Sequence, residues 1–275
     1  MITLKIRKNL GNAILVKFEN LMDSASIKLI TIIVFLISLI FSFWPWINNT
    51  FFSDNKVNLI DIMGDYIFVV VICSTLMLFM ALLITRIGAQ VGFEKGSRVT
   101  EILLTSITKS ELYISHIISS IMVFLTILCI VCVPIIAAAI ISDPNVVMIL
   151  DQLDNDELII VLTRIIIVSI QLIILAVAIT SKVTRSEDTG PYLLLVLIPF
   201  ILSNSYFAIE SNLYEGILYF LNYIPMFSLL PTIGLSISAT LEAAMGIRMV
   251  IVDIAFVFIF FIIGKKVFNK NISLK

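Results

Sequence analysis

The sequence predicts an all-α polytopic membrane protein. We expect six transmembrane helices, an N-terminal interfacial helix, a short amphipathic helix after the second span and a re-entrant helical hairpin before the last span. Of the 275 residues, 60% are hydrophobic and 13% are charged, whereas soluble domains have about 25% charged residues. The apolar residues fall in long blocks, and the basic residues gather between alternate blocks. These observations favour one membrane domain over residues 1–275.

Residues 1–26 predict a helix that lies in the plane of the membrane interface. At helical spacing, one broad face is apolar: Leu4, Leu10, Ile14, Leu15, Phe18, Leu21 and Met22. The basic side chains lie largely off this face: Lys5, Arg7, Lys8 and Lys17. Such a separation of apolar and basic faces is typical of interfacial helices.

Six apolar runs predict the spans. They cover residues 27–47, 65–86, 113–141, 158–180, 191–209 and 249–263. Trp44 and Trp46 lie at the far end of the first run, where amphipathic rings anchor a helix at the interface. Pro134 lies in the third run, which is longer than a bilayer needs, so we expect this helix to tilt or kink.

Residues 92–107 hold the densest cluster of mixed charge between two apolar runs. Helical spacing groups three apolar side chains with two charged ones beside them: Val99, Ile102 and Leu103, then Arg98 and Glu101. Ser97 precedes these positions and, with Glu101, could open a helix. The pattern predicts a short amphipathic helix in the membrane surface, with an ordinary polar loop as the alternative.

Residues 217–241 are apolar enough to enter a membrane, but Pro225, Pro231 and Gly234 interrupt them. Backbone groups freed by proline are tolerated at membrane depth only where protein or water covers them. Two short re-entrant helices therefore fit this segment better than one complete span.

The basic residues predict the orientation. All but three of the 18 lysines and arginines fall on one side of the predicted spans. Lys56 and Arg248 lie on the other side, and Arg164 lies within a span. The positive-inside rule then places both termini and residues 92–107 in the cytoplasm of a multi-pass plasma-membrane protein. The abundance of Ile, Lys and Asn suggests a bacterial source.

Two charged residues within the predicted spans form a candidate intramembrane ion pair, Arg164 with Asp253. A charge at membrane depth needs a partner or water. The alternative, which we favour at this point, is that Arg164 extends to the acidic outer loop, because its long stem can reach the interface.

Nothing in the sequence indicates catalysis on this chain. No phosphate-binding G-x-x-x-x-G-K-[ST] motif occurs. His116 is the single histidine and has no carboxylate or cysteine at ligand spacing in its own helix, so we expect no metal site. Cys129 and Cys132 form a C-x-x-C without a second pair, which favours apolar packing. We expect no enzyme activity, no cofactor and no nucleic-acid partner.

Residues 93–106 read Phe-Glu-Lys-Gly-Ser-Arg-Val-Thr-Glu-Ile-Leu-Leu-Thr-Ser. This stretch resembles the segment after the second span in permeases of the ABC type-2 exporter family, and is most similar to the sodium-exporter (NatB-like) branch. Residues 223–231 give a second, weaker match, and the order of spans extends the resemblance over nearly the whole chain.

The resemblance implies the permease subunit of an ATP-driven exporter, in a dimer with a second permease chain. A separate ATPase subunit would bind ATP and Mg, and residues 92–107 would be the coupling helix that contacts it. The residues expected to couple to the ATPase are Glu94, Lys95, Arg98 and Glu101 at the contact, with Ile102 and Leu103 holding the helix against the spans. Pro225 and Pro231 would belong to the outer gate.

The substrate class stays open. A peptide, an amphipathic compound or a lipid-like molecule is favoured, because the spans hold few carboxylates for a dedicated ion site. Efflux of sodium or another cation is the alternative. A function of another class is a non-transporting membrane scaffold, immunity protein or sensor paired with an ATPase.

Overall fold

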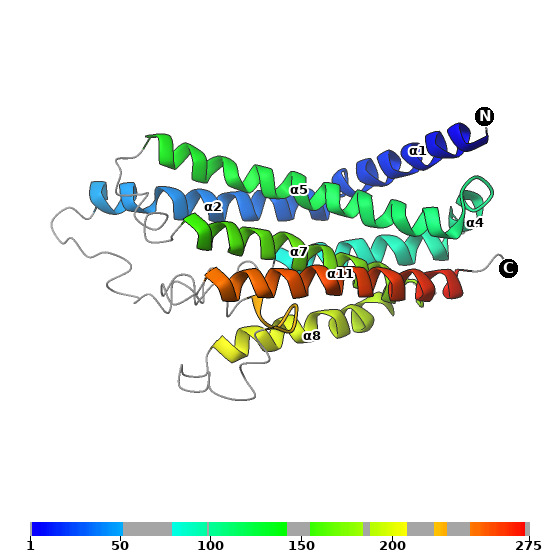
Figure 1. The fold of residues 1–275 in the computed structure, drawn as a ribbon. Coiled ribbons are helices and arrows are strands. Elements are labelled where there is room, and N and C mark those ends of the chain that lie inside the picture. The colour runs from blue at the N-terminus through cyan, green and yellow to red at the C-terminus, as the bar shows by residue number, and fades with distance from the viewer. Residues whose placement is uncertain are drawn as a thin grey trace.

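Long helices running side by side make up the computed structural model of this chain (Figure 1). The structure describes residues 2–51, 79–97, 99–141, 155–183, 188–207, 223–229 and 243–272. Every regular element within these ranges is a helix, which confirms the prediction of an all-helical protein.

The helices keep the order of the predicted apolar runs. They are α1 (Ile2–Met22), α2 (Ala25–Phe51), α4 (Val99–Leu103), α5 (Lys109–Ile141), α7 (Asn155–Thr180), α8 (Thr189–Phe207) and α11 (Ala243–Asn271). Residues 79–96 are also helical, and we call them the 79–96 helix. It continues ten positions beyond the predicted end of the second span, whose residues 65–78 lie outside the described part of the chain. The α5 helix runs on through Pro134 to Ile141.

Three of the described helices are long and apolar enough to cross a membrane: Lys109–Pro134 in α5, Ile159–Thr180 in α7 and Ala244–Asn271 in α11. The pair Asn9–Met22 and Ala25–Leu39 meets the same criterion only when counted together. The part of the chain that the structure describes therefore supplies three or four spans. This fits a multi-pass helical membrane protein, and the count of six stays a prediction.

A bend of 65° separates α1 from α2. The hydroxyl of Ser24 donates a hydrogen bond to the carbonyl of Leu21 at 2.7 Å, and the amide of Ile27 donates to the same hydroxyl at 3.4 Å. One side chain thus closes α1 and caps the start of α2, as serine does at helix N-termini. The N-terminal helix therefore lies at a steep angle to α2, and its position in the membrane interface stays a prediction.

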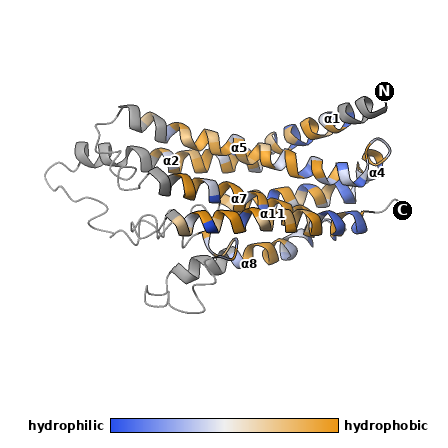
Figure 2. Cartoon of the chain, viewed as in Figure 1, coloured by the Kyte–Doolittle hydropathy of each residue, from blue (hydrophilic) through white to orange (hydrophobic). Residues whose placement is uncertain are grey.

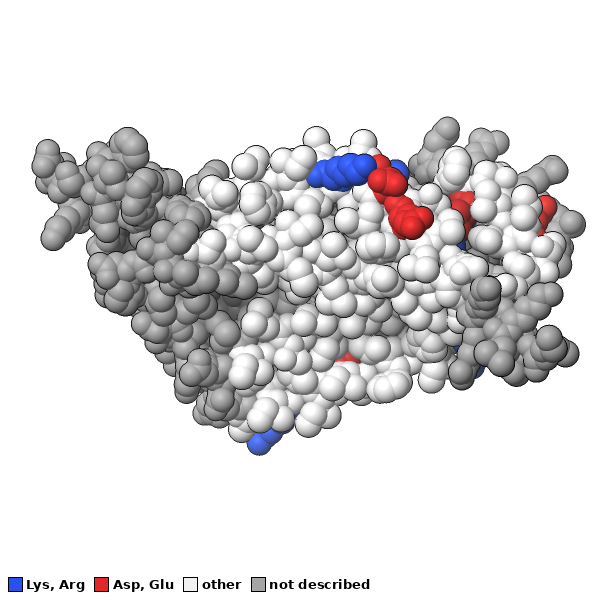
Figure 3. Space-filling view, turned by 90° about the horizontal axis from the view of Figure 1, so that it is seen from above, with Lys and Arg blue, Asp and Glu red and all other residues white. Residues whose placement is uncertain are grey.

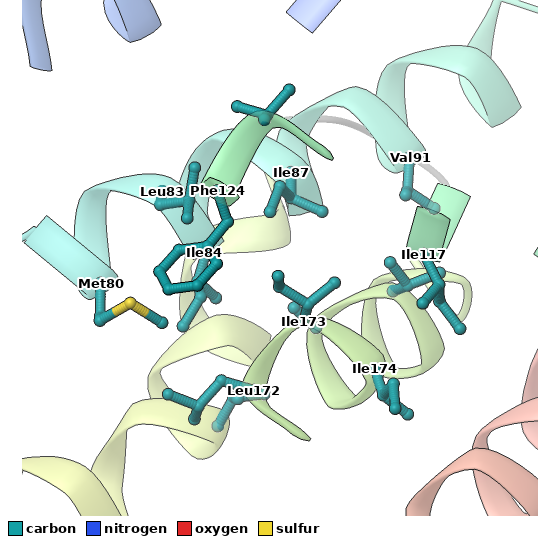
Figure 4. Close-up of a cluster of buried hydrophobic side chains, with 14 of the residues drawn as sticks. Met80, Leu83, Ile84, Ile87, Val91, Ile117, Phe124, Leu172, Ile173 and Ile174 are labelled. Carbon is teal, nitrogen blue, oxygen red and sulfur yellow. The ribbon is translucent and has the colours of Figure 1, made fainter. Parts of the chain in front are cut away.

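The apolar core lies between the 79–96 helix, α5 and α7 (Figure 4). The 79–96 helix contributes buried side chains at spacings of three and four residues, which form one helix face: Met80, Leu83, Ile84, Ile87 and Val91. Phe124 of α5 and Leu172 of α7 meet this face in Figure 4. These contacts fix the end of the 79–96 helix relative to the spans.

Polar residues gather at one end of the bundle. The start of α1, the end of α11 and α4 all lie at this end (Figure 1). Figure 2 shows hydrophilic residues at this end and hydrophobic residues along the middle of the described helices. The face drawn in Figure 3 carries few charged side chains on a broad uncharged surface, as lipid-facing helices require. The described ends of the chain, at Ile2 and Ile272, therefore lie on the same side of the apolar zone.

Candidate functional site

The stretch predicted as one helix over residues 92–107 is divided in the structure. The 79–96 helix extends to Gly96, Ser97 forms a turn, and α4 covers only Val99–Leu103. Ser97 does not open α4 as expected. Its hydroxyl donates to the carbonyl of Phe93 at 2.8 Å and so satisfies an acceptor at the end of the preceding helix. Arg98 lies outside the described residues.

One side chain of α4, that of Ile102, faces outward although we predicted that it faces the spans. Ile102, expected to hold the helix against the spans, is 69% exposed. Leu103 does pack against the core, and Thr100, three residues earlier, is buried. Positions three apart share a helix face, so Thr100 and Leu103 face inward and Ile102 faces outward. Phe93, near the end of the 79–96 helix, is also 62% exposed, so this stretch carries two large exposed apolar side chains, which we call the exposed apolar surface.

Glu94, which we predicted at the contact with an ATPase, lies inside the fold. It is 8% exposed and forms an ion pair with Lys17 of α1, itself 3% exposed. His116 of α5 lies beside both, with its Nε2 atom 2.9 Å from Lys17 Nζ and 3.4 Å from Glu94 Oε2. We call Lys17, Glu94 and His116 the buried polar cluster. It connects α1, the 79–96 helix and α5.

The Glu94 carboxylate is stabilised in its charged form within this cluster. Burial raises the pKa of Glu94, but its interactions with His116 and Lys17 and the hydrogen bonds from Lys17 and Gln90 lower it more, so the pKa lies below its ordinary value. The amide of Gln90 donates to Glu94 Oε1 at 3.0 Å. Both carboxylate oxygens are therefore engaged by groups inside the fold.

Lys95 also points into the fold. Its ammonium donates to the carbonyl of Ser181 at 2.6 Å, directly after the end of α7. Lysine at a helix C-terminus satisfies a free carbonyl and matches the negative end of the helix dipole. Glu94 and Lys95 thus attach the end of the 79–96 helix to three neighbouring helices, and Glu101 is half-buried on α4.

A groove of about 880 Å³ lies between α1, the 79–96 helix and α4. Its lining combines amides, charged groups and apolar side chains: Asn9, Asn12, Ala13, Val16, Lys17, Asn20, Arg86, Ala89, Gln90, Phe93, Glu94, Val99, Leu103 and Ser106. This volume is within the usual range of ligand pockets, about 300–1,000 Å³. The groove borders both the buried polar cluster and the exposed apolar surface.

A second polar network lies within the predicted spans. Arg164 of α7 is completely buried, and its Nε donates to Asp253 Oδ2 of α11 at 2.8 Å. The same guanidinium donates to the side-chain hydroxyl of Ser228 and, at 3.4 Å, to its backbone carbonyl. The structure brings Arg164 and Asp253 together, so the favoured interpretation, in which Arg164 extends to the outer loop, is wrong. The 223–229 turn thus supplies two partners of the guanidinium, and Met249 of α11 supplies a third, with its Sδ atom 3.1 Å from Arg164 Nη1.

The match to a family model decides the class of this protein. A model described as ABC-2 family transporter protein matches residues 61–263. The chain belongs to this family. The match covers the 79–96 helix, α4 and the Arg164–Asp253 pair, and it excludes α1. A comparison with curated proteins found no match. Membership fits a membrane permease component without catalytic activity of its own, and it does not distinguish the NatB-like branch.

Of the two residues predicted at the outer gate of this ABC-2 family chain, the structure describes only Pro225. Pro225 is buried in the 223–229 turn, next to Met226, which has a φ of 71° in the left-handed region. Pro231 lies outside the described residues, as does most of the predicted re-entrant segment 217–241.

Several residues of the ABC-2 chain's polar networks were not identified from the sequence. Lys17 was assigned to the polar face of α1, and His116 was dismissed because its own helix offers no partner. Their partners come from other helices: Glu94 is 77 positions and His116 is 99 positions from Lys17 in the chain. The sequence did contain one indication of the buried polar cluster: its single histidine shares a face of α5 with apolar residues that are buried. Among the described residues, no group of three His, Cys, Asp or Glu is placed to hold a metal ion.

Proposed function

We propose that this chain is the permease subunit of an ATP-driven exporter, working as a dimer with a separate cytoplasmic ATPase that binds ATP and Mg. The observation that carries the proposal is the exposed apolar surface at the polar end of an ABC-2 family bundle, formed by Phe93 and Ile102. Exposed apolar side chains rimmed by polar groups mark protein or membrane contacts, and the resemblance of residues 93–106 to the segment after the second span of ABC type-2 permeases favours a contact with an ATPase here.

We define the coupling surface as Phe93, Glu101 and Ile102, with Arg98 as a predicted member. Burying an apolar side chain of this size contributes about 1.5–3 kcal/mol, so Phe93 and Ile102 together would contribute about 3–6 kcal/mol to binding. Glu101 and Arg98 would add charge-assisted hydrogen bonds at the rim. This proposal differs from the contact residues predicted from the sequence, because Glu94 and Lys95 are assigned to contacts inside the permease.

The inward residues provide the route by which ATPase movement reaches the spans. Glu94 is held by α1 and α5 through the buried polar cluster, and Lys95 is held by the end of α7. Phe93, on the same helical turn, faces outward. A push on the coupling surface therefore moves the 79–96 helix as part of a rigid unit with α1, α5 and α7, and switches the spans between inward-facing and outward-facing arrangements.

The outer gate belongs to the 217–241 segment. The Arg164–Asp253 pair and Ser228 fasten the 223–229 turn to α7 and α11. Release of this contact when the spans rearrange would open the outer side. With the coupling surface in the cytoplasm, the gate lies on the opposite face of the membrane, as the basic residues predict.

A peptide, amphipathic compound or lipid-like molecule is the favoured substrate class. The carboxylate considered for a cation, Asp253, is paired with the buried guanidinium of Arg164, and a bound cation would be repelled by that charge. Cation efflux is therefore the second candidate. A scaffold, immunity or sensor function would use the same ATPase contact without transport.

The association with an ATPase is tested with two isoleucines of similar exposure. Ile102 is on the coupling surface, and Ile247, 55% exposed, is on the first turns of α11 at the opposite end of the bundle. The tagged full chain is purified from its native membranes, and co-purifying P-loop ATPase is measured by mass spectrometry. We expect Ile102→Ser to lower the recovered ATPase about tenfold and Ile247→Ser to leave it unchanged. Equal recovery from both variants would contradict the proposal.

A further inference from the structure

The groove between α1, the 79–96 helix and α4 contains a positive charge, that of Arg86, which no described residue neutralises. Lys17 and Glu94 line the groove and pair with each other. Arg86 lines it too, forms no ion pair with any described residue, and has a buried Nε without a hydrogen-bond partner among them. A buried donor that is part of a cation favours an anionic acceptor at this place.

The rest of the lining suits an amphipathic anion. Four amide side chains line the same groove and offer donors and acceptors, although the Gln90 amide already donates to Glu94: Asn9, Asn12, Asn20 and Gln90. The wall on α1 is apolar at Ala13 and Val16, and Val16 is 55% exposed beside the exposed Leu15. The apolar wall therefore continues from the groove onto the outer surface of α1, the helix predicted to lie in the interface.

We propose that this groove binds an anionic phospholipid of the cytoplasmic leaflet. Arg86 would donate to the phosphate, the amides would bind the glycerol and headgroup oxygens, and the acyl chains would lie along Val16 and Leu15. The position of Arg86 at the predicted end of the second span, residues 65–86, matches the depth of the headgroup phosphates. An acidic segment of a partner protein would satisfy the charge but would leave the apolar wall of α1 unexplained. The proposal concerns a ligand of the permease itself and does not depend on which substrate is exported.

Two variants test the site by different means. Arg86→Gln removes the positive charge, and Ala89→Phe keeps it but fills the groove. Arg248→Gln, an exposed arginine on α11 outside the groove, is the matched control. The full chain is placed in nanodiscs of phosphatidylglycerol and phosphatidylcholine, extracted in mild detergent, and the retained lipid is quantified by native mass spectrometry. Circular dichroism verifies the helical content of each variant.

We expect the unmodified chain to retain phosphatidylglycerol in preference to phosphatidylcholine. Arg86→Gln should lower the retained phosphatidylglycerol about tenfold, Ala89→Phe should lower it similarly, and Arg248→Gln should not change it. If Arg86→Gln does not fold, the phosphatidylglycerol retained by Ala89→Phe tests the proposal by itself. Retention at the unmodified level in Ala89→Phe would overturn the proposal. So would an Arg86→Gln variant that keeps its lipid but loses a co-purifying ATPase, because the groove would then hold a protein segment.

Discussion

Removing the positive charge of Lys17 should destabilise the permease far more than the loss of an ordinary surface ion pair. The side chains of Lys17 and Glu94 are only 4% and 10% exposed, so the value for buried pairs applies. Breaking such a pair by deleting one partner costs about 3–5 kcal/mol, because a charge is left buried without compensation. Lys17→Met keeps the length and apolar stem of the side chain and leaves the Glu94 carboxylate unpaired.

The assay is unfolding of the purified chain in mixed micelles as the fraction of SDS rises. We expect Lys17→Met and Glu94→Gln each to lower the free energy of unfolding by about 3–5 kcal/mol. The double variant contains no unpaired charge, so its loss should be smaller than the sum of the single losses by at least about 2 kcal/mol.

An exposed ion pair at the junction of α1 and α2 serves as the control. Lys28 and Asp23 lie 3.1 Å apart with side chains 58% and 82% exposed, and Lys28→Met should cost no more than about 1 kcal/mol. The reasoning would be refuted if Lys17→Met were as mild as Lys28→Met, or if the losses in Lys17→Met and Glu94→Gln simply added in the double variant.

Three further predictions follow from other parts of the structure. Arg164→Met leaves a buried carboxylate without its cation and should cost about 3–5 kcal/mol in the same SDS titration; a change below about 1 kcal/mol would show that the pair is not buried in the working protein. Gly264→Ala would place a Cβ against the hydroxyl of buried Tyr113 and should cost about 1–3 kcal/mol by overpacking; unchanged stability would mean that α11 packs less closely there. In a cysteine-free chain, a cysteine at exposed Ala244 should react with an impermeant thiol reagent in intact cells and one at exposed Thr105 should not; the reverse result would invert the orientation.

The helices themselves were predictable because their cause is local. Long apolar runs must form helices in a membrane, since every backbone group needs a partner within its own segment. The serine-containing turn after residue 22 bends the chain a few residues before the predicted boundary between the interfacial helix, residues 1–26, and the first span. The length of the 79–96 helix was missed because hydropathy falls after Arg86 while helical hydrogen bonding continues, and hydropathy measures only membrane depth.

The facing of individual side chains was less predictable, because it depends on partners far away in the chain. Lys17 has the pattern of a solvated lysine on α1 and becomes buried only because Glu94 and His116 arrive from other helices. Arg164 was expected to reach the interface, since the sequence cannot show that Ser228 folds back over it. The direction of Ile102 depended on where α4 begins, and Ser97 closes the preceding helix instead of opening α4.

Contact between the coupling surface and an ATPase is the central claim, and site-specific photocrosslinking tests it most directly. A photoreactive amino acid is introduced at Ile102 in the full chain, with a matched substitution at exposed Ile247 at the opposite end of the bundle. After irradiation of cells, crosslinked products are purified under denaturing conditions and identified by mass spectrometry. The account predicts that position 102 crosslinks to a P-loop ATPase and that position 247 does not. Crosslinks from position 102 to lipid or to the permease alone, with no ATPase, would contradict it.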